Sequence, residues 1–185
     1  MCHKVRAAMA DVHFRKLVGF VEVDETFVGG KAKNRHSNKR GGPGGTGNAG
    51  GRGRFGKAVI VGAIQGKGKV VARVIERTDA PTLLNFVRET VSKKVSLIST
   101  DEYQAYNAVG KEFPRGKVDH WNGQYVHGAI HTNTIEGFWS MIKRGIMGTF
   151  HKVSRKYLPL YVAEFQFRYN NRENVDIFGT AIKAC

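Results

Sequence analysis

The order of its apolar runs is the feature of this sequence that most restricts the fold. Four runs rich in valine and isoleucine are separated by glycine-rich or polar residues, as is typical of buried strands: residues 20–28, 58–64, 70–75 and 95–100. The turn residues at 65–68 predict a hairpin between the second and third runs, whereas a helical pattern that begins at Pro81 precedes the fourth. The first three runs therefore predict an antiparallel meander, and the fourth should return parallel to the first through a right-handed crossover.

The remaining chain predicts elements that extend this plan. A short helix passes through Tyr103 and Tyr106, a fifth strand follows at about 117–121, and two helices occupy about 133–145 and 155–171. The sequence thus predicts an α/β fold with a mixed sheet, an antiparallel meander plus parallel strands, flanked by helices. This order of strands and helices resembles that of ribonuclease H-like domains.

Charge and composition restrict the possible partners. The 185 residues suffice for one ordinary domain, and they carry a formal net charge of +15 at pH 7 with a pI near 10.1. This surplus predicts association with polyanions, of which nucleic acid is the commonest and an acidic membrane surface or acidic protein the alternative. No apolar run approaches the roughly 18 residues that span a bilayer, and the first residues lack the features of a secretory signal. With cysteines only at positions 2 and 185, we expect a reduced, cytoplasmic protein.

A glycine-rich segment interrupts the predicted meander between its first and second strands. Residues 29–56 contain seven lysines and arginines and no acidic residue, so we predict a mobile basic loop. The loop is interpreted either as a tolerated surface insertion or as an arm that contacts phosphates, and the single sign of its charges favours the arm. Residues 1–18, before the meander, carry only a weak helical pattern that would be marginal in isolation.

Three acidic residues stand in settings that suit a metal site. Asp24 lies inside the first apolar run, Asp101 follows the fourth, and Glu136 falls in the first turn of a predicted helix. If the first and fourth strands are neighbours, Asp24 and Asp101 lie close together, where two carboxylates repel each other unless a cation joins them. Two divalent ions such as Mg²⁺, which prefers a few carboxylates together with waters and substrate phosphate, would keep all three ionised. The set therefore predicts a two-metal site for cutting and joining phosphodiesters.

Each acid also has a simpler structural interpretation. Asp24 is alternatively a polar residue on a solvated strand face, because Glu22 shares its side of the strand. Asp101 is alternatively the cap of the helix that follows it. Glu136 is alternatively the third residue of a capping box that begins at Asn133. The occurrence of all three acids in this order favours the metal site.

A lysine shares the predicted helix with the third acid. Lys143 lies two helical turns after Glu136 on the same face, with Ser140 between them. A lysine in this place is suited to holding a phosphate beside the acids, and the alternative is an ordinary solvated lysine. The opposite face of the helix should pack on the core through Ile135, Trp139 and Ile142.

Three stretches of sequence carry a resemblance to a known family: VEVDETFVGGK at 21–31, STDEYQAY at 99–106 and HTNTIEGFWSMIKRG at 131–145. Through them the chain, over about residues 20–172, resembles bacterial insertion-sequence transposases of the DDE class, in the ISXO-like group. The resemblance implies a ribonuclease H-like catalytic domain with two Mg²⁺ or Mn²⁺ ions, and DNA cleavage with strand transfer at element ends. It also implies that element-end and target DNA are the partners, that the active complex is a homo-oligomer, and that the protein is nucleoid-associated in a bacterial cytoplasm.

The resemblance assigns roles to the residues already singled out. Asp24 and Asp101 are the first two catalytic acids and metal ligands, and Lys143 is the trailing basic residue. Family members carry Asn, Glu or His at the third position, which in this chain is Glu136 or, one helical turn earlier, Asn133. We favour Glu136 as the third catalytic residue and metal ligand, because an anionic carboxylate binds Mg²⁺ better than a neutral amide.

Two departures from the family pattern bear on activity. No CxxC pair precedes the catalytic region, so we expect the zinc-binding module that recognises element ends to be absent, and the chain stops soon after the last predicted helix. We divide the sequence into the remnant of an upstream helical or DNA-binding region (1–18), the catalytic domain (19–172) and a C-terminal tail (173–185). Two alternatives to an active transposase follow: a truncated, inactive remnant that only binds nucleic acid, and a ribonuclease H-type nuclease without a joining step.

Overall fold

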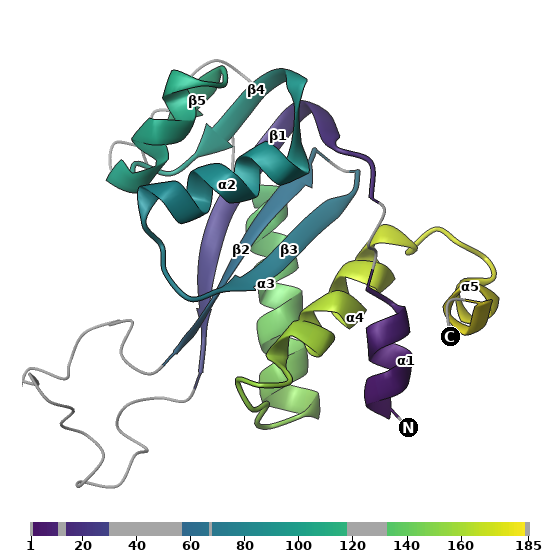
Figure 1. The fold of residues 1–185 in the computed structure, drawn as a ribbon. Helices are drawn as coiled ribbons and strands as arrows, with labels where there is room; N and C mark the ends of the chain where they lie inside the picture. The colour runs from purple at the N-terminus through teal and green to yellow at the C-terminus, as the bar shows by residue number, and fades with distance from the viewer. Residues whose placement is uncertain (1, 11–13, 30–56, 67, 118–132, 184–185) are drawn as a thin grey trace, which may run out of the picture.

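A five-stranded mixed sheet forms the centre of the protein (Figure 1). The computed structural model describes residues 2–10, 14–29, 57–66, 68–117 and 133–183. The strands lie in the order β3-β2-β1-β4-β5, and antiparallel pairs join β1 to β2 and β2 to β3, whereas parallel pairs join β1 to β4 and β4 to β5. Their bounds are β1 (Leu17–Val28), β2 (Ala58–Gln65), β3 (Val70–Ile75), β4 (Val91–Thr100) and β5 (Arg115–Lys117). The predicted meander with added parallel strands is confirmed.

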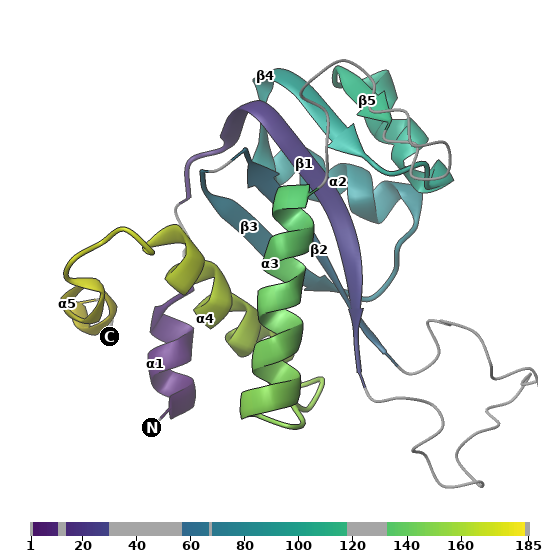
Figure 2. The same ribbon diagram turned by 180° about the vertical axis from the view of Figure 1, so that it is seen from behind.

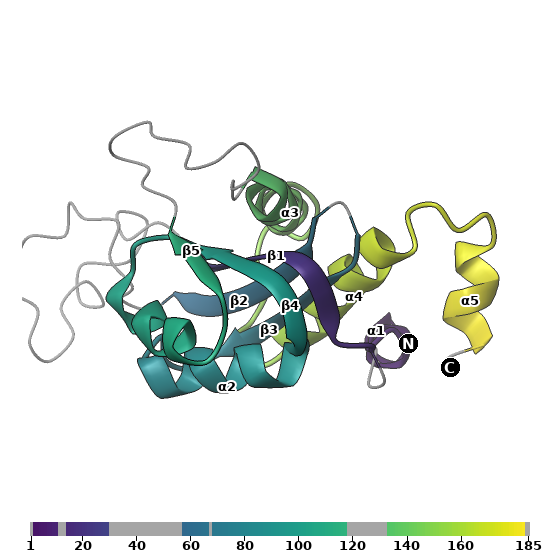
Figure 3. The same cartoon turned by 90° about the horizontal axis from the view of Figure 1, so that it is seen from above.

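Helices cover both faces of this sheet, as the view from above shows (Figure 3). On one face lies α2 (Ala80–Thr90), and on the other lie α3 (Asn133–Arg144) and α4 (Leu158–Asn170). The shorter helices are α1 (Cys2–Ala8), the 3₁₀-helix η3 (Gln104–Lys111), the π-helix η4 (Gly145–Thr149) and α5 (Ile177–Lys183). The strand order and the helices on both faces make this a ribonuclease H-like α/β fold, as the sequence predicted.

The central strand β1 separates two hydrophobic cores, because alternate residues of a strand point to opposite faces of its sheet. Val21 and Val23 are fully buried in the core beneath α2. Glu22 and Asp24 point to the other face, where their side chains accept hydrogen bonds from α3. On that face α3 packs through Ile135, Trp139 and Ile142, which the sequence predicted to be buried, and also through Phe138.

The strands β1 and β4 begin earlier than their apolar patterns predicted. Val91 also fits the helical spacing that begins at Pro81, but its backbone is extended (φ −109°, ψ 139°) and it begins β4, four residues before the predicted start. A buried β-branched residue packs well on a sheet, which favours the strand over a longer helix. Similarly, β1 begins at Leu17 and so lies partly within residues 1–18, which we had expected to lie outside the catalytic domain.

The short helix α1 is held by contacts with α4 and the segment before it. The Nε atom of Arg6 donates a hydrogen bond of 2.6 Å to Oε2 of Glu164, and its guanidinium lies 4.1 Å from the centre of the Tyr161 ring. The ring of His3 stacks on Tyr157 at 4.4 Å. These contacts account for a seven-residue helix that would be marginal alone. Its interpretation as the remnant of an upstream region stays a prediction.

Some predicted features fall outside the described residues. Of the basic loop predicted at 29–56, only Gly29 is described. The predicted fifth strand at 117–121 is described up to Lys117, where β5 ends after beginning two residues earlier than predicted, at Arg115. In the parts of the chain that are described, no helix has the length and apolar character needed to cross a membrane.

Candidate active site

The register of two parallel strands brings the first two acids together. In the β1–β4 pair, Glu22 lies opposite Ser99. Asp24 and Asp101 each follow two residues later and so lie at about the same level of the two strands, and Asp24 points to the face that α3 covers. Asp101 lies immediately beyond the last residue of β4, where the chain leaves the sheet. Two residues that are 77 positions apart in the sequence are therefore neighbours in the fold.

The carboxyl group of Asp24 lies in a partly desolvated environment beneath α3. Its Oδ2 accepts a hydrogen bond of 2.9 Å from the indole Nε1 of Trp139. Burial, with further contributions from the carboxylates of Asp101 and Glu136, raises the pKa of Asp24 from 3.8 to about 6. Hydrogen bonds from the Glu25 backbone and the Trp139 indole act in the opposite direction. Asp24 therefore does not lie on a solvated strand face, which was the alternative interpretation.

A groove of about 460 Å³ opens between β1 and α3. The polar face of α3 contributes Glu136, Ser140 and Lys143, which follow one another at about one-turn intervals, as their spacing predicted. Both Glu136 and Lys143 are exposed to solvent. The groove is lined by Asp24, Glu25, Thr26, Glu136, Trp139, Ser140, Lys143 and Arg144. It therefore joins the first acid, the favoured third acid and two cationic side chains on one surface.

Asp101 is fixed by contacts at the end of β4. Its Oδ1 accepts a hydrogen bond of 3.0 Å from the backbone N–H of Tyr103, and its backbone oxygen accepts one of 2.9 Å from Nη2 of Arg115. The first contact resembles the capping role considered as an alternative, although it lies just before η3 and not within it. Asp101 does not line the groove itself, but its carboxylate is near enough to contribute to the raised pKa of Asp24.

Glu22 has a role that the sequence did not reveal, because we considered it only within the alternative interpretation of a solvated strand face. Its side chain is fully buried, and its Oε2 accepts hydrogen bonds from the backbone N–H groups of Thr134 and Ile135 in the first turn of α3. Asn133, the alternative third residue, is exposed at the start of the same helix. The signal in the sequence was an acidic residue between Val21 and Val23, on the same side of the strand as Asp24.

The acids suit a hard divalent cation that binds with substrate, although they do not form a closed cage. Among the described residues, no group of three or more His, Cys, Asp or Glu side chains could by itself hold a metal ion. Mg²⁺ commonly takes one or two carboxylates and completes its coordination with waters and substrate phosphates, and Mn²⁺ favours the same oxygen donors. The carboxylates of Asp101 and Glu136 lie near enough to Asp24 to raise its pKa, and the three side chains offer oxygen donors of this kind.

Several known proteins share similarity with this chain. The model of the ISXO2-like transposase domain matches residues 16–170. A stretch of 73 residues is 34% identical to an uncharacterized protein in the transposable element ISH50 of Halobacterium salinarum, and it covers 38% of this chain and 24% of that protein. A chain in the intasome of simian T-cell lymphotropic virus, in complex with the PP2A regulatory subunit B56 gamma, is 13% identical with a TM-score of 0.46, over 81% of this chain and 50% of the other.

The family match is the comparison that decides the assignment, because it covers most of the chain. It spans every strand of the sheet, the helix α3 and all the residues that line the groove. The ISH50 protein is much longer than the stretch it shares with this chain, so that likeness adds only a link to a transposable element. This chain belongs to the ISXO2-like transposase family.

Proposed function

We propose that this protein is a transposase that uses divalent metal ions to cleave DNA at the ends of an insertion sequence and to join those ends to target DNA. The observation that carries the proposal is the groove between β1 and α3, where the partly buried carboxyl group of Asp24 lies with Glu136 and Lys143 in a chain of the ISXO2-like transposase family. The carboxylates of Asp101 and Glu136 lie near enough to Asp24 to repel its charged form. A bound cation would relieve the repulsion.

Each residue in the groove has a proposed role. Asp24 and Asp101 are metal ligands, and Glu136 is the third, in preference to Asn133, because Glu136 lines the groove with Asp24. These residues would hold a pair of Mg²⁺ ions, or Mn²⁺ as a substitute, which would activate the attacking oxygen and stabilise the leaving one. Trp139 holds one oxygen of Asp24 in place through its indole N–H.

The cationic side chains of α3 are proposed to bind the DNA backbone. Lys143 and Arg144 line the groove at the C-terminal end of the helix, beyond the acids. Contacts of this kind hold a phosphodiester in place without reading its sequence. In the proposed reaction, water attacks a phosphodiester at the element end and releases a 3′-hydroxyl. That hydroxyl then attacks a target phosphodiester, which forms the new bond and releases a target 3′-hydroxyl.

The proposal extends to the domain division and the partners. The proposed catalytic domain at residues 19–172 is extended at its start to Leu17, where β1 begins, with the rest of the segment 1–18 and the tail 173–185 outside it. Element-end DNA and target DNA are the substrates, two or more copies of the chain assemble in the active complex, and the protein acts at the bacterial nucleoid. The family match and the strongly basic composition support these proposals.

The test compares wild type with Asp24→Asn on labelled DNA that carries the element end, with and without Mg²⁺. Asn keeps an acceptor for the Trp139 indole but removes the charge, so the variant should bind DNA at least as well as wild type and lose cleavage and joining. Glu89→Gln is the matched control, because Glu89 is an exposed carboxylate paired with Arg73, on the opposite face of the sheet from α3. It should leave both reactions unchanged.

Three results would separate the proposal from its alternatives. Cleavage and joining that persist in Asp24→Asn would refute the assignment of the site. Mg²⁺-dependent hydrolysis without strand transfer in the wild type would identify a ribonuclease H-type nuclease. Salt-sensitive DNA binding with no reaction in the wild type would identify an inactive remnant of a transposase.

A further inference from the structure

The fully buried side chain of Glu22 joins two elements that are far apart in the sequence. It lies in the middle of β1, and its Oε2 accepts hydrogen bonds from the N–H of Thr134 at 3.1 Å and of Ile135 at 3.0 Å. The first N–H groups of a helix have no partner within the helix, so a buried helix start needs an acceptor from elsewhere. Glu22 supplies that acceptor across 112 positions of sequence.

A second hydrogen bond between α3 and β1 lies further along both elements, from the indole N–H of Trp139 to Asp24. Trp139 lies four residues after Ile135, which is about 6 Å along a helix. Asp24 lies two residues after Glu22, which is about 6.6 Å along a strand. The distance along the helix and the distance along the strand are thus nearly equal. The Glu22–Ile135 and Asp24–Trp139 hydrogen bonds therefore form together only when α3 runs along β1 in one register. Figure 2 shows α3 lying alongside β1.

A glycine on the neighbouring strand allows the second contact. Gly62 of β2 lies opposite Asp24 of β1. A Cβ atom at Gly62 would lie 2.5 Å from the Cη2 atom of Trp139 and 2.9 Å from its Cζ2 atom. The indole ring therefore occupies the space that a side chain at position 62 would fill. This fit fixes the rotation of α3, whereas the two hydrogen bonds fix its position along β1.

From this geometry we propose that Glu22 is a positioning residue, which sets the register of α3 on β1 and thereby brings Glu136 and Lys143 to the level of Asp24. The inference rests on the proposed function of the groove. Glu136 directly follows the residue whose N–H is bound by Glu22, so a shift of the helix start displaces it relative to Asp24. An apolar side chain at position 22 would fill the space but would remove the acceptor of the Thr134 and Ile135 N–H groups, the second of which is buried.

The proposal requires an acceptor of the correct length and does not require a negative charge. Gln has the same reach as Glu and an acceptor oxygen, whereas Asp keeps the charge but is one methylene shorter. Glu22→Gln should therefore retain cleavage within about threefold of wild type, and Glu22→Asp and Glu22→Ala should lose about 100-fold in kcat, since a displacement of about 1 Å at a catalytic group has an effect of that size. The KM for DNA should change little.

A matched control separates positioning from general stability. Gln166 is a buried acceptor on α4 that binds the N–H of Ala72 in β3 at 2.8 Å, so it also ties a helix to this face of the sheet. Gln166→Ala should lower the melting temperature about as much as Glu22→Ala while leaving kcat unchanged at a temperature where both variants are folded. Equal losses of kcat in the two variants would show that Glu22 acts only through stability.

A measurement without DNA keeps this test independent of the proposed function. Hydrogen exchange, followed by NMR, should accelerate at the Thr134 and Ile135 amides and at the indole N–H of Trp139 in Glu22→Asp and Glu22→Ala, but not in Glu22→Gln or Gln166→Ala. Unchanged exchange at these groups in Glu22→Ala would overturn the proposal even if the enzyme is active. Retained kcat in Glu22→Asp together with lost kcat in Glu22→Gln would also overturn it, because charge and not reach would then matter. Failure of the wild type to process DNA, with the expected exchange pattern, would contradict only the proposed function.

Discussion

The two faces of the sheet differ in how they bury β1. Toward α2, the strand presents Val21 and Val23, which pack in a core of aliphatic and aromatic side chains. Toward α3, the same strand presents Glu22 and Asp24, which accept hydrogen bonds from α3, and the buried Thr26. Buried polar groups are unfavourable unless they are paired, so the first face is suited to stability and the second to a specific arrangement. The comparison indicates that the α3 face carries both the hydrogen bonds that position α3 and the candidate catalytic groups.

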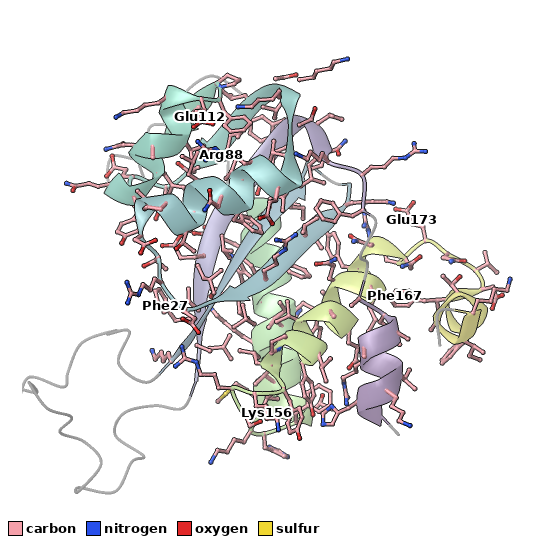
Figure 4. The ribbon with its side chains drawn as sticks, viewed as in Figure 1. Phe27, Arg88, Glu112, Lys156, Phe167 and Glu173 are labelled. Carbon is pink, nitrogen blue, oxygen red and sulfur yellow. The ribbon has the colours of Figure 1, made fainter. Side chains whose placement is uncertain are left out.

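The carboxyl groups associated with the two faces also behave differently. Glu112 lies at the surface near α2 and accepts hydrogen bonds from Arg88 and Lys93. Figure 4 labels Glu112 and Arg88. The hydrogen bond with Arg88 is the main cause that lowers the pKa of Glu112 to about 2. Burial instead raises the pKa of Asp24 to about 6. A surface carboxylate next to cations and a desolvated one next to other carboxylates thus shift in opposite directions.

The largest effect on cleavage is expected from replacing the third acid on the α3 face. Glu136→Gln should lower Mg²⁺-dependent cleavage by about 10²–10³-fold, the range found when one preorganised charged or dipolar group is removed from an active site. Asn133→Ala should change cleavage only severalfold, because Asn133 is exposed at the start of α3 and does not line the groove. Single-turnover cleavage of labelled DNA measures both. The opposite result would make Asn133 the third position.

An intermediate effect is expected from one added methyl group on the α3 face. Gly62→Ala should lower the free energy of unfolding by about 1–3 kcal/mol, because its Cβ would collide with the Trp139 ring, and should also reduce cleavage by displacing that ring from Asp24. Denaturant unfolding and cleavage assays measure the two quantities.

The control for Gly62→Ala lies in the other core. Leu83 of α2 is fully buried there, and Leu83→Ala should lower the free energy of unfolding by about 2–5 kcal/mol while leaving cleavage unchanged at a temperature where the variant is folded. If Leu83→Ala reduced cleavage as strongly as Gly62→Ala, the two faces would not differ in the way we infer.

The smallest expected effects concern the pH dependence of stability in metal-free protein, and they should have opposite signs. The raised pKa of Asp24 destabilises the fold above about pH 6, so Asp24→Asn should be more stable than wild type at pH 7.5, and this difference should disappear below about pH 4. The lowered pKa of Glu112 stabilises the fold above about pH 4.5, so Glu112→Gln should be less stable than wild type at neutral pH.

The Glu112 difference should fade between about pH 4.5 and pH 2, as the wild-type carboxyl group becomes protonated. Its size should be modest, because the ion pair lies at the surface. Melting temperatures across pH 3–8 measure both differences. Stabilisation by Asp24→Asn that is equal at pH 4 and pH 7.5 would contradict the desolvated state that we infer for this carboxyl group.

The sequence predicted the elements of the site better than their boundaries. Apolar runs bounded by glycine-rich or polar residues identified β1, β2 and β3, and the spacing in α3 correctly placed Trp139 toward the core and Lys143 on the polar face. The start of β4 was wrong, because the buried position of Val91 suits both a helix end and a strand start until its neighbours are known. Boundaries depend on tertiary packing, which overrides local propensity.

What the sequence determined by itself is the order of strands and the set of candidate groups. A strand period of two and the helical spacing are local properties, so Asp24, Asp101 and Glu136 could be placed on their elements before any contact was known. Only the tertiary structure decided that Glu22 and Asp24, two acids on the same side of one strand, have different surroundings. Glu22 lies beneath the first turn of α3 and is fully buried, whereas Asp24 opens into a groove. The physical reason is that a hydrogen-bond partner 112 positions away exists only once α3 has docked.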